Sequence, residues 1–276
     1  MKSDDLKSPL GAVLGLAAVL IGTVGSASAH FLEVLPETSV LSSSEPKPIG
    51  IDLTFTHPMA GGPVMTLARP KAVEVLAEGR KTSLLENLEK VERQGKEAYR
   101  LIHTPEGPGA HIYYVEPEPY WEPAEDAYIV HFTKTIVDAY DGGEGWDALV
   151  GAPVEIEPLT RPFGIWSGSV FSGRVLKDGE PFADSIVEVE YRGEGRFDLP
   201  SAAFETQELK TDGNGIFHVA LPRAGWWGMA ALVEAPTALE SPDGRQVPLE
   251  WGGALWIEAR DLTESGMFAG GEEGKQ

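Results

Sequence analysis

The chain has 276 residues and carries 22 Lys and Arg against 43 Asp and Glu, a formal net charge of −21 at pH 7. This charge argues against nucleic acid or an anionic membrane surface as a partner and favours a cationic ligand. The sequence contains no cysteine, which excludes disulfides, thiolate metal ligands and a lipid-modified cysteine.

The first residues have the pattern of an export signal. Lys2 and Lys7 give a basic start, an apolar run too short to span a membrane securely follows, and the run ends in the small-x-small sequence ASA that a signal peptidase cuts. We expect residues 1–29 to be a cleaved signal peptide and the mature protein, starting at His30, to be soluble in the periplasm without inserting into the membrane. An uncleaved amino-terminal anchor is the alternative.

Most of the remaining chain alternates apolar and polar residues with a period of two, as in PIGIDLTFTH, EAYRLIHT, HIYYVE and AYIVHFTKTIV. Gly and Pro, 32 and 21 in number, supply the turns that such a fold needs. Only KTSLLENLEKVE, residues 81–92, has a mixed spacing that indicates a short helix. We therefore predict an all-β fold of antiparallel, immunoglobulin-like β-sandwiches.

A domain boundary is expected near EIEPLTRPFG, where two prolines bracket a polar junction. We predict an N-terminal β-sandwich over residues 30–160, a C-terminal immunoglobulin-like β-sandwich over residues 161–262 and a flexible tail over residues 263–276. In the second domain, Asp178-Gly179 and Asp243-Gly244 are expected to form two-residue hairpin turns, since Gly tolerates positive φ.

Several enzyme motifs are missing from the sequence. It has no Gly-x-Ser-x-Gly and no His-Glu-x-x-His, and GGEEGK near the end lacks the first glycine of a phosphate loop. TDGNGIF resembles the start of a calcium loop, but Ile216 and Arg223 occupy its fifth and twelfth positions, so we expect a simple turn. We predict a binding protein and not an enzyme; a metal-assisted hydrolase or oxidase is the alternative.

His30 is the first candidate metal ligand. Once the signal is removed, this residue carries two nitrogen donors, the free α-amine and the imidazole, which can close a chelate ring on a divalent metal ion. Their unperturbed pKa values, ~7.7–8.0 and ~6.5, allow both groups to lose protons near neutral pH. The pair cannot form while the signal is attached. The alternative is that processing leaves a histidine there by chance.

Two further histidines lie in strand patterns. His57 ends the strand IDLTFTH on the core-facing parity, at the rim, where Pro58 holds it extended. His131 lies in YIVHFTK and shares its parity with Ile129, so it can approach the same region if its strand neighbours the first ones. Both histidines are candidate ligands, and a hydrogen-bonded structural histidine is the alternative for each.

The other candidate side chains rank lower or point to a different metal. His103, His111 and His218 lie in polar or strand-edge contexts. Met59 and Met65, in HPMAGGPVM, are possible thioether ligands, which would favour Cu(I) over divalent ions.

Several long segments together carry a family resemblance: AHFLEVLP, FTHPMAGGPVM, PYWEPAEDAYIVHFTK, GWDALVGAPVEIEPLTRPFGIWSGSVFSGRVLKDGEPF, VEVEYR and PRAGWWGMAAL. They resemble the additional periplasmic component, NikK, of nickel ECF-type transporters, over nearly all of the mature chain. The resemblance implies a periplasmic protein that captures Ni²⁺ and supplies it to membrane-embedded transporter subunits. It also implies His30, His57 and His131 as metal ligands, in the first domain, and it counts against His111, where the family more often has an aromatic residue.

Carboxylates near the third histidine are further candidates. Glu122, Glu125 and Asp126 can supply an oxygen ligand or a hydrogen-bond acceptor that orients an imidazole. A solvated loop is the alternative.

Two other functions stay open. The same nitrogens bind Cu²⁺ more tightly than Ni²⁺, so a periplasmic copper carrier is one alternative. A carbohydrate-binding or adhesive β-sandwich is the other, with Trp121, Trp226 and Trp227 as exposed platforms. For the adjacent pair Trp226 and Trp227, we expect one ring in the core and its neighbour over the domain junction.

Overall fold

The computed structural model describes residues 30–42 and 46–262. The predicted signal peptide and the predicted tail lie outside these residues. Within them the regular secondary structure is almost entirely β-strand, and the helical segments are two short 3-10 turns, Leu85–Asn87 and Ala202–Phe204. The predicted all-β class is confirmed. No helix in the described part of the chain is long and apolar enough to cross a membrane.

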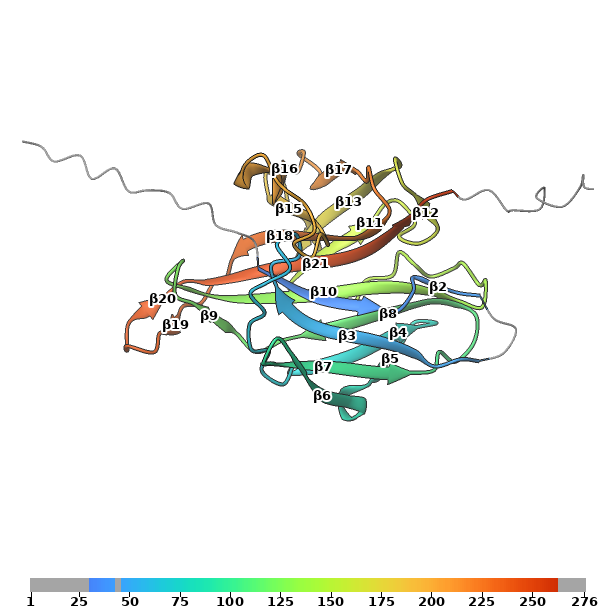
Figure 1. The fold of residues 1–276 in the computed structure, drawn as a ribbon, viewed down its shortest axis with the longest axis horizontal. Coiled ribbons are helices and arrows are strands. Elements are labelled where there is room, and N and C mark those ends of the chain that lie inside the picture. The colour runs from blue at the N-terminus through green and yellow to red at the C-terminus, as the bar shows by residue number, and fades with distance from the viewer. Residues whose placement is uncertain (1–29, 43–45, 263–276) are drawn as a thin grey trace, which may run out of the picture.

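The strands form three stacked layers (Figure 1). The first sheet contains β1 (Phe31–Pro36), β3 (Ile49–Thr56), β7 (Lys96–His103) and β6 (Leu88–Arg93), in that order. The central sheet contains β16 (Gln207–Lys210), β15 (Ile186–Tyr191), β18 (Gly225–Glu234), β21 (Leu249–Arg260), β10 (Ala127–Ala139), β8 (Gly109–Glu116), β4 (Ala72–Ala77) and β5 (Arg80–Ser83), in that order.

Shorter strands complete these layers. At the margins of the central sheet, β2 (Val40–Leu41) and β9 (Tyr120–Glu122) pair with β10, and β12 (Ile165–Trp166) pairs with β21. The third sheet contains β11 (Val154–Pro158), β13 (Val170–Lys177), β14 (Glu180–Pro181) and β17 (Ile216–Ala220). A separate hairpin consists of β19 (Leu239–Glu240) and β20 (Gln246–Val247).

The central sheet draws strands from both halves of the chain. Its strands β10 and β21 lie side by side in parallel, with His131 opposite Gly252 (Figure 1). The short strands β2 and β12 also pair in parallel, whereas the remaining strand pairs are antiparallel. Pairing therefore crosses position 160, both through β10–β21 and through β11–β13. The division into domains at that position stays a prediction.

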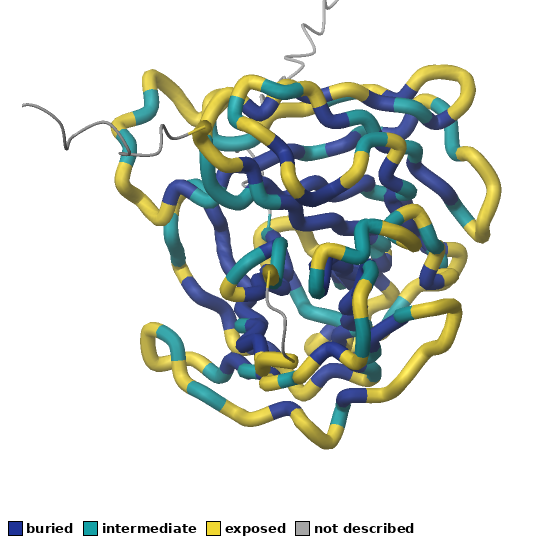
Figure 2. The backbone as a smooth tube through the Cα atoms, turned by 90° about the vertical axis from the view of Figure 1, so that its right-hand side faces the viewer, coloured by how far each residue is buried: buried dark blue, intermediate teal, exposed yellow. Residues whose placement is uncertain are grey.

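Alternation along the strands sends side chains of the central sheet into two different cores. On β8, Tyr113 and Val115 pack toward the first sheet, whereas Ile112 and Tyr114 pack toward the third sheet. Each fully buried side chain of this kind contributes about 1.5–3 kcal/mol, so both faces stabilise the sheet. The buried segments accordingly run through the interior, and the exposed ones lie at the connections (Figure 2).

A smaller cluster joins β1 to β18 and β21. It contains Phe31, Leu35, Ala230, Ala254 and Trp256, and the half-buried Trp226 packs against it. The neighbouring Trp227 lies in the core shared with the third sheet. The two adjacent tryptophans therefore face opposite sides of the sheet, as predicted.

The short helix predicted for residues 81–92 is wrong. This segment consists of the end of β5, a 3-10 turn and β6. β6 pairs with β7, with Leu88 opposite Leu101 and Val91 opposite Ala98. The cross-strand hydrogen bonds and the burial of Leu88 outweigh the local helical spacing.

One of the two predicted hairpin turns is confirmed. Asp178 and Gly179, with φ of 52° and 83°, connect β13 to β14 directly. Asp243 and Gly244 do not form a two-residue turn. They lie within a longer loop between β19 and β20, which hydrogen bonds between Ser241 and Arg245 close. The Ser241 hydroxyl accepts the Arg245 N–H at 3.0 Å, and the Ser241 N–H donates to the Arg245 carbonyl at 2.8 Å.

Candidate metal centre

His30 and His57 are brought together by the register of the first sheet. Phe31 at the start of β1 pairs with Thr56 at the end of β3, so the residue before one strand lies beside the residue after the other. The two imidazole centroids are 4.1 Å apart. Phe55 and Tyr120 surround His30, with ring centroids 5.8 and 6.0 Å from its own.

Glu122 determines which nitrogen of His30 is available. The Glu122 carboxylate lies 3.0 Å from Nε2 of His30, and its other oxygen accepts the Ala124 N–H at 2.8 Å. Because a carboxylate accepts hydrogen bonds, Nε2 of His30 carries the hydrogen. Nδ1 of His30 then presents its lone pair, and this buried atom has no hydrogen-bond partner. An imidazole whose second N–H is held by a carboxylate is the usual arrangement of a metal-bound histidine.

His131 is held on β10 by close packing. Its side chain is 4% exposed, and its Nδ1 has no hydrogen-bond partner. Phe31 and Phe55 lie edge-on to the ring at 6.0 and 6.2 Å. Gly252 on β21 makes room for the ring, since a Cβ at that position would lie 2.4 Å from Cδ2 of His131.

His30 and His131, whose Nδ1 atoms lack partners, are both held in the neutral form. Burial, and then the neighbouring His57, lower the pKa of His30 to about 4, although Glu122 acts in the opposite direction. Burial, with a smaller effect of His30, lowers the pKa of His131 to about 3. Desolvation disfavours the charged imidazolium, so the contact between His30 and Glu122 at neutral pH is a hydrogen bond with a neutral ring.

His30 and His131 line one small cavity of about 120 Å³. The other lining residues are Ile129, Leu232, Glu125, Glu188 and Glu250. Glu188 lies on β15 and Glu250 on β21, and the sequence prediction missed both. The alternation within each strand indicates only which residues of that strand share a face. No spacing in the sequence shows that β15 and β21 lie near β10.

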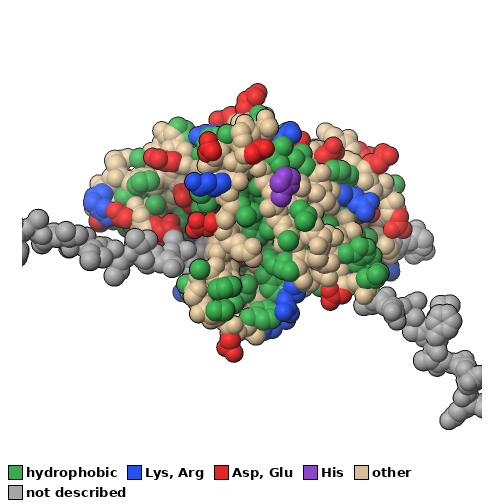
Figure 3. All heavy atoms as spheres, turned by 90° about the horizontal axis from the view of Figure 1, so that it is seen from above, with side chains coloured by type: hydrophobic (Ala, Val, Ile, Leu, Met, Phe, Trp, Pro, Cys, Tyr) green, Lys and Arg blue, Asp and Glu red, His purple; other side chains and the backbone are tan. Residues whose placement is uncertain are grey.

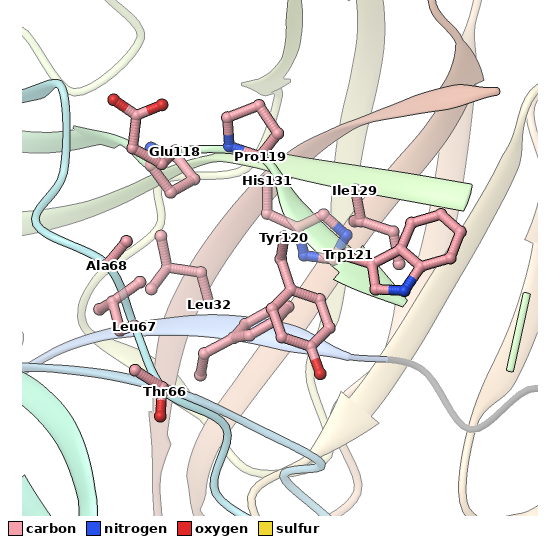
Figure 4. A pocket seen from close by; sticks show the side chains of 12 residues that line it. Leu32, Thr66, Leu67, Ala68, Glu118, Pro119, Tyr120, Trp121, Ile129 and His131 are labelled. Atoms are coloured by element: carbon pink, nitrogen blue, oxygen red, sulfur yellow. The ribbon is translucent and has the colours of Figure 1, made fainter. Parts of the chain in front are cut away.

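A second pocket adjoins His131. It has a volume of about 270 Å³ and is largely apolar, with Phe55, Tyr120 and Trp121 among its lining residues. Figure 4 shows the His131 ring among the side chains of Leu32, Tyr120 and Ile129. The imidazole therefore separates an apolar pocket from a cavity that carries carboxylates.

The histidines are neighbours and do not form a closed cage. Within residues 30–42 and 46–262, no group of three or more His, Cys, Asp or Glu side chains is arranged to hold a metal ion. The donor chemistry nevertheless fits a borderline divalent ion, because two buried imidazole nitrogens lack partners beside a third imidazole.

Other sequence candidates have different surroundings. Asp126 pairs with Arg245 at 2.7 Å and is exposed. His103 bonds to the Tyr113 hydroxyl at 3.0 Å, and His218 to the Ser172 hydroxyl at 2.7 Å.

The remaining candidates are also held elsewhere. His111 bonds to the Gly109 carbonyl at 3.1 Å. Met65 packs in the core of the first sheet, and Met59 lies against Gly193.

The three candidate tryptophan platforms do not share a groove. Trp227 is 3% exposed and donates its indole N–H to the Arg223 carbonyl at 3.0 Å. Trp121 lines the apolar pocket beside His131, and Trp226 lines a separate polar pocket of about 460 Å³. The converging surface that the carbohydrate hypothesis requires is not formed by these rings.

The family described as "Domain of unknown function (DUF4198)" matches residues 27–235. The chain belongs to this family. The DUF4198 match contains His30, His57 and His131, whereas Glu250 lies beyond its end. No curated protein matches the chain.

Among solved structures, the DUF4198 chain is similar to the D0-D1 domain of intimin, with 12% sequence identity and a TM-score of 0.24, over 82% of this chain and 99% of that chain. It is also similar to dimeric latent PorU from Porphyromonas gingivalis, with 13% identity and a TM-score of 0.22, over 84% of this chain and 20% of that chain. Because these TM-scores are low, the assignment of the fold rests on the strand pairing described above.

Proposed function

We propose that this protein captures Ni²⁺ in the periplasm and supplies it to an ECF-type nickel uptake transporter. The observation that carries the proposal is the state of His30. Glu122 holds its Nε2–H, its Nδ1 has no partner, and its ring lies beside His57 on a cavity shared with His131. The protein acts by capture and release of the ion and not by catalysis.

Removal of residues 1–29 completes this donor set. It converts the peptide nitrogen of His30 into an α-amine, and this amine can close a chelate ring with Nδ1 of the same residue. Nδ1 is the nitrogen that the contact with Glu122 leaves unpartnered. His57 and His131 supply further imidazole nitrogens, which suit Ni²⁺.

The choice of nickel is supported by the resemblance to the additional periplasmic component of nickel ECF-type transporters. Nitrogen donors alone favour Cu²⁺ over Ni²⁺, so in the cell the supply of the ion and the transporter select the metal. A copper carrier using thioether ligands gains no support, because Met59 and Met65 do not line the cavity.

The test is calorimetric titration of Ni²⁺, with Cu²⁺ and Zn²⁺ in parallel, into protein that begins at His30. A form with one Gly placed before His30 separates the amine from the imidazole and leaves the fold unchanged. We expect one-to-one binding of Ni²⁺ that weakens about tenfold, or ~1.4 kcal/mol, in the extended form.

Three variants locate the remaining ligands. His57→Ala and His131→Ala are expected to weaken Ni²⁺ binding, whereas His218→Ala, a remote histidine on β17, is the matched control and should bind as the wild type does. Equal binding by both amino-terminal forms would overturn the chelate. No binding of any metal would overturn the proposed function.

A further inference from the structure

Three carboxyl groups line the cavity together with His30 and His131. Glu125 lies in the turn before β10, Glu188 on β15 and Glu250 on β21. Glu125 is exposed at the rim, and Glu188 and Glu250 are half-buried. Glu250 is opposite Ile129 across the parallel β10–β21 pair, two positions before the pair that joins His131 to Gly252. Glu250 therefore lies on the same face of the central sheet as His131, and Glu188 lies on this face too, because it is opposite Ala230, which is opposite Ala254 on β21.

These carboxylates have no cation to balance them. Two buried acids elsewhere have a cationic partner, because Glu33 pairs with Arg192 at 3.1 Å and Glu155 with Lys134 at 2.6 Å. In the described part of the chain, no ion pair involves any of the three cavity carboxylates. Burial and the neighbouring carboxyl groups raise the pKa of Glu188 to about 8 and that of Glu250 to about 7. Carboxyl groups gathered in a partly desolvated cavity repel one another when ionised, so they hold either protons or a cation that displaces the protons.

An unpartnered histidine in the same cavity independently indicates a ligand. His131 is 4% exposed and lines the cavity, and its Nδ1 has no hydrogen-bond partner. Leaving a buried polar atom unsatisfied costs about 1–3 kcal/mol, which a bound ion with its water molecules would remove. A cavity of about 120 Å³ has room for a divalent ion and several water molecules.

We propose that Glu125, Glu188 and Glu250 form an outer, oxygen-lined subsite that holds a hydrated divalent cation on the solvent side of His30 and His131. Carboxylate and water oxygens suit a hydrated divalent ion, whereas the imidazoles suit the ion after it has lost part of its water. Ni²⁺ first binds at the carboxylates and then exchanges water for imidazole nitrogen. The role of the inner ligands in this step rests on the proposed function.

The general charge of the protein must be separated from this subsite. A net charge of −21 attracts cations to the whole surface. On the face seen in Figure 3, Asp and Glu side chains are scattered among hydrophobic and uncharged ones. A control that removes the same number of carboxyl groups away from the cavity therefore isolates the contribution of the subsite.

The test has two measurements. The equilibrium affinity for Mn²⁺, an ion that prefers oxygen ligands, is measured by electron paramagnetic resonance. The rate of Ni²⁺ association is measured by stopped-flow fluorescence. The variant is Glu188→Gln with Glu250→Gln. Its control is Glu89→Gln with Glu180→Gln, which replaces two exposed carboxyl groups on β6 and β14. We expect the cavity variant to bind Mn²⁺ at least tenfold more weakly than the control and to associate with Ni²⁺ at least threefold more slowly.

Glu125→Gln, at the exposed rim, is a second variant that leaves the packing unchanged, and it should show the same effects to a smaller degree. Identical Mn²⁺ binding and Ni²⁺ association in cavity and control variants would overturn the subsite. Wild-type protein that binds Ni²⁺ tightly but never Mn²⁺ would overturn the subsite alone. Protein that binds Mn²⁺ through these carboxylates but never Ni²⁺ would support the subsite and overturn the proposed function.

Discussion

Replacing Glu122 with Ala is expected to weaken Ni²⁺ binding by the chain that begins at His30. In the structure, one carboxylate oxygen accepts the Nε2–H of His30 at 3.0 Å, and the Glu122 side chain is 8% exposed. A hydrogen bond to a charged group of this kind contributes about 1.5–3 kcal/mol. Its loss frees the ring to rotate or to carry its hydrogen on Nδ1, the nitrogen that the metal needs. The expected loss of affinity is about 10- to 100-fold.

The assay is calorimetry on the wild type, Glu122→Ala and Glu122→Gln. The amide oxygen of Gln can still accept the Nε2–H of His30, although its NH2 group cannot accept the Ala124 N–H, so Glu122→Gln should lose less than about tenfold. Nitrogen chemical shifts of His30, measured without metal, report the tautomer independently. Ni²⁺ affinity of Glu122→Ala equal to that of the wild type, or a His30 ring protonated on Nδ1 in the wild type, would refute the reasoning.

Three further predictions concern packing and charge. Gly252→Ala should weaken Ni²⁺ binding in calorimetry, because its Cβ would lie 2.4 Å from Cδ2 of His131, whereas Gly213→Ala, which has open space, is the neutral control. Glu155→Ala should lower the free energy of unfolding in urea by about 3–5 kcal/mol. The reason is that the buried Lys134 on β10, whose ammonium group lies 2.6 Å from the Glu155 carboxylate, would be left unpaired. Burial raises the pKa of Glu33 from 4.5 to about 7. The folded state therefore keeps this proton at pH values where the unfolded state has lost it. The free energy of unfolding falls by about 3 kcal/mol between pH 4.5 and 7, and Glu33→Gln should flatten this part of the pH profile of the urea midpoint.

The sequence alone predicted the fold class and named His30, His57 and His131 as candidate ligands. Period-two alternation predicted strands, and the same alternation placed His131 with Ile129 on one face, which the cavity lining confirms. It also predicted that Trp226 and Trp227 face opposite sides. These features follow from local geometry, because successive side chains of a strand point to opposite faces.

The neighbours of each strand were decided only by the tertiary structure. The register of β1 with β3 brings His30 within 4.1 Å of His57, measured between ring centroids. The parallel pairing of β10 with β21, more than a hundred residues later, brings Glu250 to the cavity. The pairing of distant strands depends on which apolar faces cover one another in three dimensions, and alternation within one strand carries no information about it. The candidate ligands could thus be named from the sequence, whereas the cavity and its carboxyl groups depend on the pairing of strands that are far apart in the sequence.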